Sequence, residues 1–228
     1  GSCWGYQVAY GSPDCTYGTT CQSESSEADQ LSGTYTNPYQ INFKDGALYT
    51  GSHDYPLDNY ICKKQMSSGT VDCLFKPVNF GGHASMIGLM PDSASDDVFY
   101  GLGNCLVRWR AATNEFVQLS CRCRVWGISQ HTVTGDVYFG CREGSNGLYR
   151  LPASHTDGPY STSNSATETL MISGERAMYQ VVDSANNELY YTSEDTNAVM
   201  KLKLSGSFDE LTVIAGDNGV GYSGDGGL

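Results

Sequence analysis

The sequence predicts an all-β protein made of repeated, four-stranded antiparallel sheets. Three observations lead to this prediction: strand-like segments recur in four units, cysteines occur at hairpin spacing, and turn-forming and strand-forming residues are abundant. The 228 residues include 27 Gly and 16 Tyr but only 7 Pro, which suits many short strands joined by tight turns. Charged residues make up 17%, too few for a disordered, highly charged chain.

The four units share one order of four strand-like features. Each begins with a triplet expected to lie in an inner strand, and the triplets are Tyr39–Ile41, Ile87–Leu89, Trp126–Ile128 and Tyr179–Val181. An aliphatic–aromatic pair comes next, then a short apolar segment that ends in Lys or Arg, then a fourth apolar segment. Such repeats are typical of β-propeller blades. The blades are predicted near residues 34–78, 80–122, 124–173 and 175–215.

The last unit resembles an NHL repeat, a four-stranded blade of one β-propeller family. The segments that carry the resemblance are Tyr179–Asp183, Asn187–Tyr191 and the closing Gly-Tyr-Ser-Gly-Asp-Gly-Gly of 221–227. The resemblance implies a propeller that closes with six blades, so the four visible blades are expected to be part of a longer ring. Residues 1–33 are interpreted as a cysteine-containing N-terminal segment or linker. A closed four-bladed ring is the alternative.

Charge and cysteine content restrict the environment of the protein. With 13 Lys+Arg against 25 Asp+Glu, the net charge of −12 argues against nucleic acid or anionic lipid as partners. No apolar run approaches the ~20 residues of a membrane helix, so membrane insertion is not expected. Nine cysteines without paired Cys-x-x-Cys motifs favour disulfides over zinc, and therefore an extracellular or cell-surface protein.

Six cysteines flank predicted hairpin turns at matching distances. Residues equidistant from such a turn face each other, within reach of a disulfide. The predicted pairs are Cys62–Cys73, Cys105–Cys121 and Cys123–Cys141. Cys121 and Cys123 could exchange partners. Cys3, Cys15 and Cys21 are odd in number, so one of them is free, joined to another chain, or paired beyond Leu228.

Few residues stand out as site candidates, and no catalytic motif is present. His83, Arg124 and Arg176 lie at or just before predicted inner strands, where the blades of a propeller converge on a central channel. An ordinary polar channel lining is the simpler interpretation. Asp217 and Asp225 are candidate calcium ligands, with turn formation as the simpler role. No other cofactor is expected.

The predicted function is that of an extracellular, non-enzymatic interaction or structural module within a larger glycoprotein or assembly, with a repeating polymer as an extension of this idea. The expected partner is other polypeptide, either the remainder of the propeller or a neighbouring subunit. The alternative is a metal-dependent propeller enzyme of the lyase or lactonase type. The resemblance reaches a metal-using amidating lyase, but the histidine-rich metal site of that enzyme has no match here.

A lectin-like sugar binder is the third hypothesis, because tyrosine-rich loops suit contacts with sugars. The hydroxyl-rich segment 161–169 is a candidate for O-linked glycans, with a solvated loop as the simpler interpretation.

Overall fold

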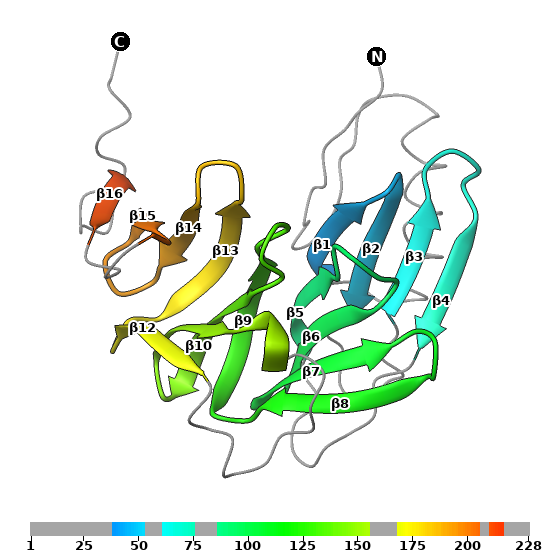
Figure 1. The fold of residues 1–228 in the computed structure, drawn as a ribbon, viewed down its shortest axis with the longest axis horizontal. Coiled ribbons are helices and arrows are strands. Elements are labelled where there is room, and N and C mark those ends of the chain that lie inside the picture. Colours follow the sequence, from blue (N-terminus) through cyan, green and yellow to red (C-terminus); the bar gives the residue numbers. More distant parts are fainter. Residues whose placement is uncertain (1–37, 53–60, 76–85, 156–167, 206–209, 217–228) are drawn as a thin grey trace, which may run out of the picture. The chain divides into compact units, whose positions relative to one another are not determined.

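The structure, a computed structural model, describes residues 38–52, 61–75, 86–155, 168–205 and 210–216. These residues form four four-stranded antiparallel sheets, each a simple meander in chain order, and one short 3₁₀ turn at Ala153–His155 (Figure 1). The predicted all-β propeller fold with four blades is confirmed. The described part of the chain contains no helix with the length and apolar character of a membrane span.

The sheets are called blades I to IV in chain order. Blade I comprises β1 (Pro38–Lys44), β2 (Ala47–Ser52), β3 (Ile61–Gln65) and β4 (Val71–Phe75). Blade II comprises β5 (Met86–Pro91), β6 (Val98–Leu102), β7 (Cys105–Arg110) and β8 (Glu115–Ser120). Blade III comprises β9 (Cys123–Gln130), β10 (Val137–Gly144), β11 (Gly147–Leu151) and β12 (Thr169–Ser173). Blade IV comprises β13 (Ala177–Asp183), β14 (Glu188–Ser193), β15 (Ala198–Lys203) and β16 (Leu211–Ala215).

Two compact units divide the chain, Gly1–Pro77 and Val78–Leu228. Blade I belongs to the first unit. Its β1–β2 hairpin turns at Asp45 and Gly46, which both have positive φ angles (51° and 75°), as a two-residue type I′ turn requires. Blades II, III and IV belong to the second unit.

An acid–base pair recurs in blades II, III and IV and explains why the third segment of each of these units ends in a base. In blade II, Asp97 immediately precedes β6, and the Arg108 guanidinium on β7 lies 2.8 Å from its carboxylate. The equivalent pairs, Asp136–Arg150 in blade III and Glu188–Lys201 in blade IV, lie at 2.6 and 3.1 Å. Blade I has Ala47 at the acid position, and its Lys63 ammonium instead lies over the Tyr49 ring, 5.4 Å from the ring centroid.

Two clusters of buried side chains join blades II to IV. One cluster includes Phe99 and Leu106 of blade II together with Ile128 and Phe139 of blade III. The other cluster contains Tyr138 and Leu148 of blade III. Its members from blade IV are Ala177, Leu189, Tyr191, Ala198, Met200 and Leu202. Each inter-blade surface is therefore an apolar core of its own.

Glycines allow the inner strands to approach the preceding blade closely. Gly127 of β9 and Gly140 of β10 are paired in register, and the Gln180 side chain of β13 lies against both. A Cβ on Gly127 would lie only 2.1 Å from Gln180 Oε1, and a Cβ on Gly140 only 2.2 Å from Gln180 Nε2. No side chain other than hydrogen fits at these two positions without displacing blade IV.

The strand register corrects one detail of the predicted repeat. Ile128 pairs with Phe139 in blade III, and Gln180 pairs with Tyr191 in blade IV. Gln180 is therefore the counterpart of Ile128, and the inner-strand triplet Tyr179–Val181 is displaced by one residue. Matching the middles of the triplets sets Gln180 equivalent to Gly127, because the sequence does not show which residue of an inner strand faces the preceding blade.

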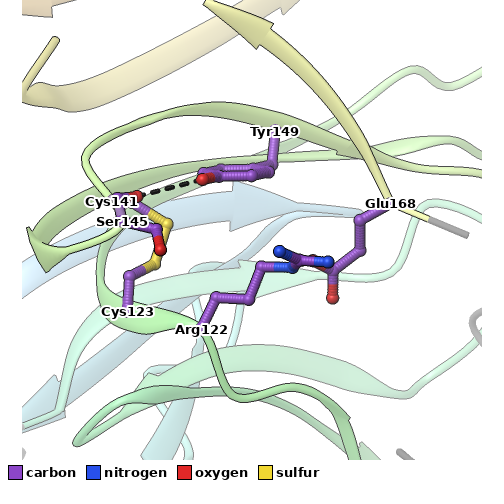
Figure 2. The surroundings of a disulfide bond; sticks show 6 residues. All are labelled: Arg122, Cys123, Cys141, Ser145, Tyr149 and Glu168. Atoms are coloured by element: carbon purple, nitrogen blue, oxygen red, sulfur yellow. Dashed lines mark hydrogen bonds and ion pairs between the residues drawn. A yellow bond between two sulfur atoms is a disulfide. The ribbon is translucent and has the colours of Figure 1, made fainter. Parts of the chain in front are cut away.

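Three disulfides, Cys62–Cys73, Cys105–Cys121 and Cys123–Cys141, join the same pairs that the hairpin positions predict. Figure 2 shows the third of them, with Arg122 beside Glu168 in an ion pair and the Tyr149 hydroxyl donating to the Ser145 carbonyl at 3.1 Å. These contacts connect β11 to the turn that follows β10, and the residue before β12 to the residue before β9. Cys3, Cys15 and Cys21 lie outside the described residues.

Peptide mapping without reduction should recover the three hairpin disulfides. Replacing both Cys62 and Cys73 by serine should lower the free energy of unfolding by about 2–3 kcal/mol, since the short closed loop no longer restricts the unfolded chain. The reduced protein is the control for the mapping. A Cys121–Cys141 peptide, or free thiols at all six positions, would contradict this arrangement.

Acid should weaken the protein partly through Asp92. Burial opposes ionisation of Asp92, but hydrogen bonds from the Gln130 side chain, the Ala94 amide and the Ser95 hydroxyl, together with the Arg108 charge, hold the pKa of Asp92 below its usual 3.8. A carboxylate with a lowered pKa in the folded state contributes its full stabilisation above its unfolded pKa, and loses it as the pH falls toward the folded value.

Urea unfolding between about pH 6 and 2 should therefore show a shallower acid-side loss of stability for Asp92→Asn than for the unaltered protein. Equal slopes in the two proteins would show that the hydrogen bonds of Asp92 do not favour its charged form.

Candidate interaction site

Three arginines and a tryptophan gather where strands of blades III and IV begin and end. Arg124 and Trp126 lie on β9, and Arg142 on β10 pairs with Arg124 in the strand register. Arg176 immediately precedes β13. The antiparallel order of the strands brings the start of each inner strand beside the end of its neighbour, which places these side chains at one end of the two blades.

The Trp126 ring binds two guanidinium groups. The Cζ atom of Arg142 lies 4.7 Å from the ring centroid, and that of Arg124 lies 5.5 Å from it. Both distances are within the range of cation–π attraction. Trp126 is itself buried, so it acts as a fixed platform that orients both arginines.

Carboxylates connect the arginines across the two blades. Glu194 lies 2.9 Å from Arg142 and 3.4 Å from Arg176. Arg176 also donates from its backbone N–H and its Nε to Asp195, at 2.6 and 2.7 Å. The Arg176 hydrogen bonds lower the pKa of Asp195. A chain of charges thus runs from blade III to blade IV.

The cluster combines oriented donors with partial exposure. The Arg124, Arg142 and Arg176 side chains are each about a third exposed (27%, 29% and 35%). Arg124 contacts Glu143 at 3.2 Å. Planar guanidinium groups present several N–H donors in a fixed geometry and suit carboxylates and carbonyl oxygens of a partner. Arginine and tryptophan are also enriched among the residues that contribute most to protein–protein binding.

Two of the three residues predicted to line a central channel belong to this cluster. Arg124 and Arg176 both belong to it and are connected through Trp126, Arg142 and Glu194. His83 lies outside the described residues. That the three residues face one central channel stays a prediction.

The sequence predicts no site role for Trp126 or Arg142 of the cluster, or for Glu194, which joins Arg142 to Arg176. Arg142 pairs with Arg124 in a register that sets Cys141 opposite Val125 and Cys123 opposite Gly144. The symmetry of the cysteines about the turn would instead place Arg124 opposite Gly140, so it gives no signal for Arg142. Nothing local points to Glu194, whose contacts cross from one blade to the next.

The calcium candidates Asp217 and Asp225 lie outside the described residues, and calcium binding there stays a prediction. Within the described ranges, no group of three or more His, Cys, Asp and Glu side chains is arranged to hold a metal ion.

Comparisons with known proteins identify the fold. No family model matches the sequence, and no curated protein matches it. Among solved structures, an auxiliary nutrient binding protein from Bacteroides ovatus has a TM-score of 0.59 at 11% identity, over 82% of this chain and 44% of that one. One from Bacteroides thetaiotaomicron has a TM-score of 0.58 at 10% identity, over 80% and 43%. A chain of a nidogen/laminin complex has a TM-score of 0.56 at 12% identity, over 75% and 62%.

The fold and these likenesses define the class of the protein, a β-propeller. At 10–12% identity the likeness extends to the fold alone, and the chain spans less than two thirds of each of these three chains. The similarity to NHL repeats remains a resemblance. The three disulfides indicate an oxidising environment, which fits a secreted or surface protein.

Proposed function

We propose that this protein is an extracellular, non-enzymatic interaction module that binds another polypeptide through the cluster of Arg124, Trp126, Arg142 and Arg176. One observation carries the proposal: the arginines are oriented by a buried tryptophan and by carboxylates, yet remain partly exposed. Pre-oriented side chains lose little conformational entropy on binding, which favours affinity. The disulfides support the extracellular setting.

The charge distribution supports a polypeptide partner that offers carboxylates or backbone carbonyls. The protein carries a net charge of −12, so it repels polyanions overall. Within the cluster, the three arginines are balanced by Glu143, Glu194 and Asp195, so the local charge is less negative than that of the whole protein. Carboxylate side chains fit guanidinium groups in paired hydrogen bonds, and they are far less charged than nucleic acid or a lipid surface. The nidogen/laminin structure shows a similar fold in a protein complex, which is in keeping with the proposal.

Binding assays with matched variants test the proposal. The native protein, Arg124→Ala/Arg176→Ala and the control Arg110→Ala would be immobilised and exposed to extracellular extract of the source tissue, and captured proteins quantified by mass spectrometry. Arg110 is also partly exposed and ion-paired, but it lies on blade II and outside the cluster. The double variant should lose at least about tenfold of the specific capture, as expected when anchor arginines are removed, while the control should keep it.

Equal capture by all three proteins would overturn the role of the cluster. Stoichiometric zinc or calcium together with lyase or lactonase activity would instead support the enzyme hypothesis. Selective binding on a glycan array would support the sugar-binding one.

A further inference from the structure

The three blades of the second unit differ in how exposed one of their two faces is. We use forward face for the face of a blade that points toward the next blade in chain order. On blades II and III, forward-face residues Phe99, Leu106 and Leu148 have no exposed surface. The register places Tyr190 and Val199 at the corresponding positions of blade IV, and both are partly exposed.

Apolar side chains continue across the forward face of blade IV. Tyr179 is 41% and Val181 66% exposed on the inner strand β13. On the outer strand β16, Ala215 pairs with Val199 of the same face and is exposed. An apolar row that is buried on two blades and open on the third indicates a surface that a partner covers.

The contact between successive blades has a recurring centre. We call the inner-strand residue that meets the preceding blade the docking residue, Ile128 in blade III and Gln180 in blade IV. Ile128 meets Gly88 of β5, where a Cβ would lie 3.0 Å from its side chain, and Gln180 meets Gly127 and Gly140. In both cases a large docking residue fills space that glycine leaves free.

Blade IV reverses this arrangement. The register places Tyr179 and Thr192 where blade III has Gly127 and Gly140. The two residues are held together, because the Tyr179 backbone N–H donates to the Thr192 hydroxyl at 3.2 Å. A large docking residue such as Ile128 or Gln180 has no space to occupy on this face.

We propose that the forward face of blade IV receives a further four-stranded blade whose docking residue is small: glycine, alanine or serine. The occupant is inferred from continuity, since the interfaces between blades II and III and between blades III and IV repeat the same faces, rows and central contact. At the centre of the contact between two blades, the total side-chain volume stays the same when the large residue lies on the forward face and the small one is the docking residue. Packed interfaces tolerate exchanges that conserve volume in this way. This inference does not depend on the arginine cluster.

Extended chains test the size rule directly. A second copy of residues 175–216, which contains no cysteine, would be joined after Leu228 of the full chain. The copy would carry either glutamine or glycine at its docking position. The preceding blade would carry either Tyr179 or Tyr179→Gly, which gives four combinations. Val181→Cys in the original blade reports on coverage through its rate of reaction with a maleimide, quantified on its own peptide by mass spectrometry.

Two combinations should protect the thiol at least about tenfold relative to the unextended chain: Tyr179 with a glycine copy, and Tyr179→Gly with the glutamine copy. Tyr179 with the glutamine copy should leave the thiol reactive. Circular dichroism verifies that each chain is folded, and Tyr179→Ala replaces Tyr179→Gly if the latter is not.

The proposal would be overturned if the thiol were protected equally whatever the sizes of residue 179 and of the docking residue in the copy. It would also be overturned if none of the four chains protected the thiol. An unextended chain that dimerises and thereby protects Val181→Cys would overturn it too, because the occupant would then be a second copy of the protein.

Discussion

Replacing Arg108 by methionine is expected to lower the free energy of unfolding by about 3–5 kcal/mol, the cost of leaving buried charge unpaired. The Arg108 guanidinium lies 3.0 Å from the Asp92 carboxylate and 2.8 Å from that of Asp97, and all three side chains are nearly buried. Without the cation, the two carboxylates repel each other in a region of low polarity. Methionine keeps most of the side-chain volume, so the loss reports on charge.

Urea unfolding of Arg108→Met measures this effect. Lys203→Met is the matched control, since Lys203 forms its ion pair with Glu210 at the surface, where such pairs contribute about 0–1 kcal/mol. Adding Asp92→Asn and Asp97→Asn to Arg108→Met should recover part of the lost stability. If Arg108→Met cost no more than Lys203→Met, the buried ion pair would have no structural role.

Gly127→Ala is expected to cost about 3 kcal/mol or more, at the upper end for overpacked interiors. The added Cβ would lie 2.1 Å from Gln180 Oε1 and 2.2 Å from the backbone oxygen of Met178. A flexible side chain can turn away, but a backbone oxygen cannot move without displacing β13. Blade IV should therefore separate from blade III, or the protein should fail to fold.

Gly88→Ala is the matched control for thermal and urea unfolding. Gly88 holds the corresponding position in blade II, but its added Cβ would meet the end of the Ile128 side chain at 3.0 Å, which can adjust. We expect a clearly smaller loss there. Equal losses at Gly88 and Gly127 would argue that the general effect of replacing glycine by alanine in a strand, rather than inter-blade contact, determines the loss of stability.

Local patterns in the sequence were sufficient to predict the blades. Hairpin symmetry indicated which cysteines face each other, and the recurring bases at Arg108, Arg150 and Lys201 correctly marked the third strand of their blades. The acids that pair with these bases are not evident from the sequence, since each lies at or just before the start of the second strand, more than ten residues away from its base.

Contacts between blades were much harder to predict. The triplet at Tyr179 is displaced by one residue because the position of Gln180 is set by its contact with Gly127 of the preceding blade. The sequence of a single strand does not show this contact. The same reason hid Glu194, which joins Arg142 of blade III to Arg176 of blade IV. Sequence periodicity reports which face of a strand is apolar. It does not report which residue of a neighbouring blade that face meets.

Hydrogen exchange of the monomeric protein, followed by mass spectrometry, tests most directly the claim that blade III is covered on both faces and blade IV on one. Amides of β9 should exchange most slowly among the described strands, because β9 is buried between blades II and IV. Amides of β16, whose five residues are all exposed, should exchange orders of magnitude faster through local opening. Equally slow exchange in β16 and β9 would contradict an open blade IV, and fast exchange in β9 would contradict the ordered series of blades.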